Sequence, residues 1–220
     1  MVAYVIIPGI DGSDDRHWQS RWEQAWGDAA VRIAPASWTR PELRDWVAAV
    51  QAAYDVAAAR TGRVDGAVDG EGDGGADGRV ALVALVAHSL GCWAATEWLA
   101  RARPRGVPAF LAAPPDPRGP AFPATAAPTF RELSARPLPG PALVVASEDD
   151  PYADATASAA LAADWRAPWR SVGAHGHLNS ASGLGDWPVG QELLHTLAGP
   201  CAASRRPDTP GCAAPWDGSR

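Results

Sequence analysis

The segment Ala87-His88-Ser89-Leu90-Gly91 places a serine between an apolar run and a helical pattern. A sharp turn from a strand into a helix holds such a hydroxyl clear of the sheet, where it can act as a nucleophile. The strained backbone of this turn needs small residues two positions to either side. Ala87 and Gly91 meet that need, although alanine departs from the usual glycine. The pattern predicts a nucleophile at Ser89; the alternative is an ordinary helix cap.

Three other residues with reactive side chains are expected to be structural. His88 occupies the variable position of the turn and should point away from the serine, which favours a packed or hydrogen-bonded imidazole. Cys92 lies in the following helix and is better interpreted as a small buried residue than as a thiol nucleophile. His17 precedes a helical pattern, and we expect a structural role for it as well.

An acidic loop, Ser147-Glu148-Asp149-Asp150-Pro151, follows the apolar run 142–146. Pro151 biases Asp150 toward an extended backbone, which suits a carboxylate directed out of the end of a strand. We therefore select Asp150 to orient a catalytic base. The alternatives are Asp149, or two ordinary acids at the start of a helix.

The glycine-flanked loop 173–179 carries two histidines. His177 would accept the serine proton at one ring nitrogen while Asp150 holds the other, and His175 is the competitor. The chain order serine, acid, histidine is that of an α/β-hydrolase triad, and each residue follows a predicted strand. This agreement predicts Ser89, Asp150 and His177 as the catalytic residues.

The turn Pro8-Gly9-Ile10 follows the first apolar run and would lie beside the serine. Backbone N–H groups of Ile10 and Leu90 are the expected donors to a tetrahedral oxyanion. The alternative is an ordinary turn before a capped helix. A phosphate-binding loop is disfavoured because neither GxGxxG nor GxxxxGK is present.

A parallel sheet is needed to bring these loops together. Apolar runs predict strands at 2–7, 31–35, 80–86, 109–112, 142–146 and 169–172. Helical patterns are expected at 41–60, 90–103, 153–165 and 189–197, and in a first helix capped by Ser13 that carries Trp18, Trp22 and Trp26. Alternating strands and helices predict a three-layer α/β/α sandwich with a mainly parallel sheet.

Composition predicts one domain, residues 1–198, in a chain of 220 residues with 47% hydrophobic content. The Gly/Asp-rich stretch 61–79 is expected to be a flexible surface insertion, and 199–220 a disordered tail whose Cys201 and Cys212 would pair only in an oxidising compartment. A net charge of -6 disfavours nucleic acid and anionic membranes as partners. We expect a cytoplasmic protein without a metal or cofactor.

These motifs together resemble the retinoblastoma-binding-protein-9 and YdeN-like serine hydrolases over residues 3–198. The resemblance includes His17-Trp18-Gln19 and, most specifically, Gly176-His177-Leu178-Asn179 followed by Ser182-Gly183-Leu184-Gly185-Asp186-Trp187-Pro188. By position Ser89, Asp150 and His177 match the family triad, which disfavours His175 and Asp149. The 61–79 insertion, the tail and Leu178 depart from the family pattern.

The resemblance implies a small hydrolase, nearly without a lid, that cleaves an ester or amide. We expect a small-molecule substrate, with short-chain esters as the first to test and amidase or aminopeptidase activity open. The pocket should be shallow, with walls from Trp18, Trp93, Phe122 and Trp187. Because some family members act as binding proteins, a non-catalytic protein-binding module on a hydrolase scaffold is the alternative.

Overall fold

The computed structural model of this chain describes residues 2–62 and 82–198. Most of the expected insertion and the whole expected tail, with Cys201 and Cys212, lie outside the described residues. The domain boundaries therefore remain predictions.

Six parallel strands form one sheet in the order β2-β1-β3-β4-β5-β6. The strands are β1 (Val2–Ile7), β2 (Ala30–Arg32), β3 (Leu82–His88), β4 (Ala109–Ala112), β5 (Ala142–Ala146) and β6 (Trp169–Ser171). The chain leaves β1 toward β2 on one side and returns through β3 on the other. The carboxyl ends of β1 and β3 thus flank a switch point, where α/β sheets place their sites.

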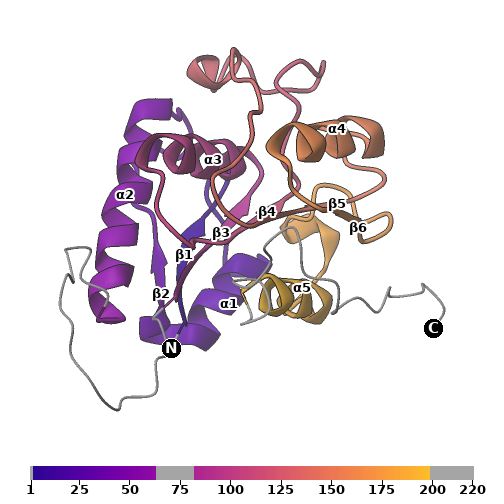
Figure 1. Cartoon of the computed structure of the whole chain (residues 1–220). Helices are drawn as coiled ribbons and strands as arrows, with labels where there is room; N and C mark the ends of the chain where they lie inside the picture. The colour runs from indigo at the N-terminus through magenta and orange to yellow at the C-terminus, as the bar shows by residue number, and fades with distance from the viewer. Residues whose placement is uncertain (1, 63–81, 199–220) are drawn as a thin grey trace, which may run out of the picture.

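Helices cover both faces of this sheet (Figure 1). They are α1 (Trp18–Trp26), α2 (Leu43–Arg60), α3 (Leu90–Ala102), α4 (Ala155–Trp165) and α5 (Pro188–Ala198), with short 3-10 turns at Gly27–Ala29, Pro128–Phe130 and Ser180–Ser182. α1 and α5 pack on one face, and α2, α3 and α4 on the other. This arrangement confirms the predicted three-layer α/β/α sandwich.

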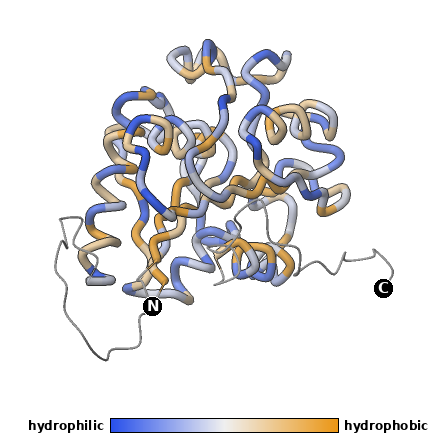
Figure 2. Tube along the Cα trace, in the orientation of Figure 1, coloured by the Kyte–Doolittle hydropathy of each residue, from blue (hydrophilic) through white to orange (hydrophobic). Residues whose placement is uncertain are grey.

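Alternate residues of each strand serve two separate hydrophobic clusters. Val5, Ile7 and Leu85 face the layer of α2, α3 and α4, whereas Ile6 and Val86 face α1 and α5. The strands are therefore apolar on both faces, and Figure 2 shows them as the most hydrophobic part of the trace.

The expected pocket walls are instead part of this core. Trp18 and Trp187 pack against each other in the α1 and α5 layer, with ring centroids 4.9 Å apart. Trp93 and Phe122 are buried in the other cluster. Trp18 and Trp93 are each only 1% exposed, so their indoles fill the interior and do not line an open pocket. The prediction was wrong because large aromatic side chains gain free energy by burying their area in the core on both faces of the sheet.

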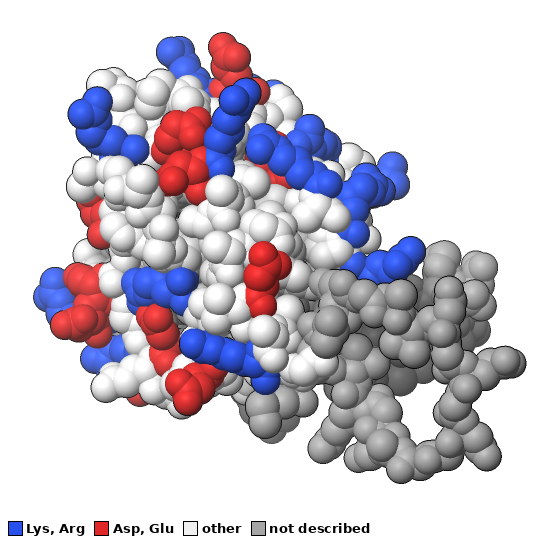
Figure 3. All heavy atoms as spheres, turned by 90° about the vertical axis from the view of Figure 1, so that its left-hand side faces the viewer, with Lys and Arg blue, Asp and Glu red and all other residues white. Residues whose placement is uncertain are grey.

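Charged side chains of both signs are interspersed on the face turned toward the viewer in Figure 3. This mixture differs from the clustered basic surface that binding to a phosphate backbone needs. Among the described residues, no helix combines the length and the apolar character that crossing a membrane requires.

The first helix begins later than expected. His17, not Ser13, is the N-cap of α1, and its Nδ1 accepts a hydrogen bond from the Gln19 N–H. Asp14 accepts from the backbone N–H groups of Arg16 and His17, which forms a turn ahead of the helix. The Ser13 hydroxyl donates instead to the Gln19 side chain, 2.8 Å away. A local side-chain turn at Asp14 thus displaces the helix start.

His17 is a buried histidine with one unpaired ring nitrogen. Because Nδ1 is an acceptor, the neutral ring carries its proton on Nε2, which has no hydrogen-bond partner among the described residues. Burial lowers the pKa of His17 from 6.5 to about 4. The ring packs edge-on against His88, with centroids 4.7 Å apart. The structure thus agrees with a structural role for His17.

α3 approaches the end of β1 so closely that only glycine fits at its second position. A Cβ added at Gly91 would lie 2.4 Å from the carbonyl oxygens of both Ile7 and Pro8. Neither backbone oxygen can move without shifting β1.

We expect Gly91→Ala to lower the free energy of unfolding by about 1–3 kcal/mol, because the added methyl overpacks this contact. Urea denaturation checks this. Gly140→Ala is the matched control, since its Cβ would meet one atom within 4 Å, the Val107 oxygen at 3.2 Å. Equal stability losses in the two variants would contradict the steric account.

The lowered pKa of His17 makes stability depend on pH. Between pH 6.5 and about 4 the unfolded chain binds a proton that the folded protein excludes, so stability present above pH 6.5 is lost on acidification. His17→Asn keeps a side-chain oxygen for the helix cap and removes this titration.

We expect wild type to lose on the order of 3 kcal/mol more than His17→Asn between pH 7 and pH 4. Urea denaturation at a series of pH values gives this difference. His195→Asn, at an exposed histidine of α5, is the matched control. Parallel pH curves for wild type and His17→Asn would show that His17 is protonated in the folded protein.

Candidate active site

Ser89 joins the end of β3 to the start of α3 in a strained conformation. Its φ is 54° and its ψ is -130°, and its side chain makes no helix-capping hydrogen bond. An ordinary N-cap serine has extended backbone and bonds the first turn of its helix. The Ser89 N–H is held by the Ala112 carbonyl at 2.9 Å, which ties the turn to β4. These features are those of a nucleophile elbow.

The imidazole of His177 lies between Ser89 and Asp150. The serine hydroxyl donates to Nε2 at 2.7 Å, and Nδ1 donates to the Asp150 carboxylate, with each carboxylate oxygen 2.9 Å from Nδ1. The Asp150 side chain is only 2% exposed, and the Tyr152 N–H donates to its Oδ1. Burial excludes water from the carboxylate, so these hydrogen bonds take the place of solvent around it.

Asp149 and His175, the alternatives to Asp150 and His177, lie in the same two loops but make different contacts. Asp149 is exposed and accepts hydrogen bonds from the Ser147 hydroxyl and the Gly176 N–H, which together lower its pKa. His175 is exposed, and its backbone N–H donates to the Ser147 hydroxyl. Asp149 thus joins the acid loop (residues 147–152) to the base loop (residues 173–179).

The base loop has left-handed backbone on both sides of His177, which is strained at Leu178 but not at Gly176. Gly176 and Leu178 have φ values of 59° and 49°, and the Leu178 side chain is fully buried. Two carbonyls of the loop are held from other elements: His88 Nε2 donates to the His177 oxygen at 2.8 Å, and Trp18 Nε1 to the Leu178 oxygen at 2.8 Å. The ring of Tyr152 packs against the imidazole with centroids 4.4 Å apart.

The contacts from His88 and Trp18 were absent from the sequence analysis. His88 is buried and hydrogen-bonded, as expected, but the sequence does not say that its partner is the backbone of His177. Trp18 and Leu178 are 160 positions apart, so no local pattern links them. Cys92 is buried, burial raises the pKa of its thiol, and Sγ donates to the Ala112 carbonyl, which confirms a packing role.

The turn after β1 lies directly beside the serine. A Cβ added at Gly9 would be 2.7 Å from the Ser89 Cβ and 3.1 Å from its Oγ, so a side chain there would block the hydroxyl. Within the described residues, the N–H groups of Ile10 and Leu90 have no hydrogen-bond acceptor. Both donors are therefore available to a ligand next to the serine.

The comparisons agree with this fold. A family model described as serine hydrolase matches residues 4–62 and 77–196. A YdeN-like hydrolase structure from Pectobacterium atrosepticum is 26% identical, with 90% of this chain and 91% of that chain covered and a TM-score of 0.69. The ydeN gene product from B. subtilis is 21% identical, with 89% and 97% covered and a TM-score of 0.65.

Est1E from Butyrivibrio proteoclasticus, with ferulic acid bound, shares the fold at 13% identity, with 90% of each chain covered and a TM-score of 0.63. No curated protein matches the chain. The family match and the YdeN-like neighbours confirm the resemblance noted from the motifs. Because the family model spans most of its residues, this chain belongs to the serine hydrolase family.

Proposed function

We propose that this protein hydrolyses a small ester or amide through an acyl-enzyme on Ser89. The observation that carries the proposal is the hydrogen-bond chain from the Ser89 hydroxyl through His177 to the buried Asp150. Such a chain activates a serine that is a weak nucleophile on its own. Family membership implies a small-molecule substrate.

In the acylation step, the Ser89 oxygen attacks the substrate carbonyl as His177 Nε2 takes the hydroxyl proton. The carbonyl oxygen becomes an oxyanion, and the free N–H groups of Ile10 and Leu90 stabilise it. His177 then gives the proton to the departing alcohol or amine, and a water molecule repeats the sequence to release the acid. Asp150 stays ionised and fixes the tautomer of His177.

The strain at Ser89 favours catalysis over a purely structural scaffold. A non-glycine residue with this φ and ψ costs on the order of 1–3 kcal/mol and persists only where surrounding structure enforces it. A binding module would not need a serine hydroxyl in that conformation. Burial of the Asp150 carboxylate also costs free energy. In a non-catalytic module nothing would compensate for that cost.

We expect a fluorophosphonate probe to label wild type at neutral pH and not to label Ser89→Ala. The probe reacts with an activated serine, whose hydroxyl must be deprotonated by a nearby base. In-gel fluorescence measures labelling, and circular dichroism shows that both proteins are folded. Folded wild type that stays unlabelled would favour the alternative of a protein-binding module.

His177→Ala is expected to lower kcat for p-nitrophenyl acetate by about 10³-fold or more, as do losses of the base in other triads. His175→Ala is the matched control, because this exposed histidine lies two positions away and touches neither Ser89 nor Asp150. The assignment of the base is wrong if the control is inactive and His177→Ala is active.

A further inference from the structure

Gln19, in the first turn of α1, has a side-chain amide that joins three distant parts of the chain. Its exposed fraction is 0%. Nε2 donates to the Ile7 carbonyl at 3.3 Å and to the Val86 carbonyl at 3.0 Å, and Oε1 accepts from the Ser13 hydroxyl at 2.8 Å. Both amide hydrogens are used, and a buried amide that lost these partners would be costly, so its orientation is fixed.

The partners of Gln19 flank the segments that carry the proposed oxyanion donor Ile10 and the nucleophile. Ile7 ends β1 and immediately precedes the oxyanion loop (residues 8–13), whose last residue is Ser13. Val86 lies in β3, three positions before Ser89. One amide therefore holds both ends of the oxyanion loop and the strand that carries the nucleophile.

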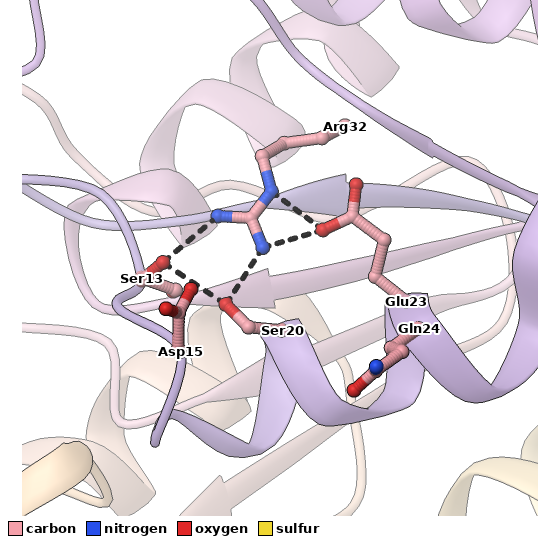
Figure 4. Close-up of a pocket in the computed structure, with 6 residues that line it drawn as sticks. All are labelled: Ser13, Asp15, Ser20, Glu23, Gln24 and Arg32. Atoms are coloured by element: carbon pink, nitrogen blue, oxygen red, sulfur yellow. Dashed lines mark hydrogen bonds and ion pairs between the residues drawn. The ribbon is translucent and has the colours of Figure 1, made fainter.

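A second set of bonds fixes the far end of the loop (Figure 4). The Ser13 carbonyl accepts from the Ser20 hydroxyl at 2.9 Å and from Arg32 at 3.2 Å. Arg32, in β2, also contacts Ser20 and is paired with Glu23 at 2.7 Å. The charge of Arg32 is thus balanced by a carboxylate. This favours a role for the guanidinium in holding the end of the loop in place over a role in anion binding.

The middle of the loop has a different character. A turn bond joins Gly12 N–H to the Gly9 carbonyl, and Asp11 N–H donates to the Trp38 carbonyl. Ile10 N–H, between them, has no acceptor among the described residues. The loop is therefore held on both sides of a donor that is left free.

We propose that Gln19 is a positioning residue for the oxyanion hole, fixing the Ile10 N–H relative to Ser89 through Ile7, Val86 and Ser13. This inference rests on the proposed function. Gln19 has no exposed surface and cannot touch substrate, so it acts through the loop. An oxyanion donor works only within about 2.7–3.1 Å of the developing charge, and a small displacement of the loop weakens the transition state more than the ground state.

Two variants test the inference. Gln19→Leu keeps much of the volume and removes all three hydrogen bonds, whereas Ser13→Ala removes only the bond between loop and amide. We expect kcat/KM for p-nitrophenyl acetate to fall about tenfold or more in Gln19→Leu and by a smaller factor in Ser13→Ala. Affinity for phenylboronic acid, whose tetrahedral adduct on serine places an oxygen in the hole, should fall by the same factors.

Ser158→Ala is the matched control, because it removes a 1% exposed hydroxyl from α4 that accepts a bond from Trp169. A purely structural effect would lower thermal stability in all variants without changing boronic acid affinity. Unchanged kcat/KM and boronic acid affinity in folded Gln19→Leu would overturn the inference.

If Gln19→Leu does not fold, the test falls to Ser13→Ala, a change at a half-buried residue. Wild-type kcat/KM and boronic acid affinity in Ser13→Ala would then overturn the inference. Failure of the proposed function is distinct from these outcomes. In that case wild type itself neither hydrolyses the ester nor binds the boronic acid, and the inference falls with it.

Discussion

A serine with φ of 54° and ψ of -130° lies at the junction of β3 and α3, and contacts from neighbouring elements hold it in that conformation. Gly91 lets the helix approach the end of β1, and Gly9 leaves the hydroxyl uncovered. The Ala112 carbonyl fixes the Ser89 N–H from the neighbouring strand. The strain is therefore distributed over β1, β3 and β4, which are buried on both faces.

α1 links the loops that converge on this serine. Trp18 donates to the Leu178 carbonyl. The adjacent Gln19 donates to the end of β1 and to the interior of β3, and it accepts from Ser13 of the oxyanion loop. Trp22 reaches further along the chain to the Asp186 carbonyl. One short helix thus connects residues near both ends of the domain.

Strands buried on both faces were the most predictable elements, because their apolar runs are continuous; 109–112 and 142–146 match the structure residue for residue. Loop order sufficed to select Ser89, Asp150 and His177, which the structure places within hydrogen-bonding distance, while their catalytic roles remain predictions. The start of α1 was wrong because a turn at Asp14 competed with the cap. Long-range bonds such as that of Trp18 leave no local pattern.

In the proposed mechanism, the elbow makes Ser89 a nucleophile that forms an acyl-enzyme. Mixing the protein with p-nitrophenyl acetate, quenching in acid within the first turnover and mapping the peptides by mass spectrometry tests it directly. We expect one acetyl group on the peptide that contains Ser89. Release of p-nitrophenol with the acetyl group on another residue, or with none on Ser89 at any quench time, would contradict the claim.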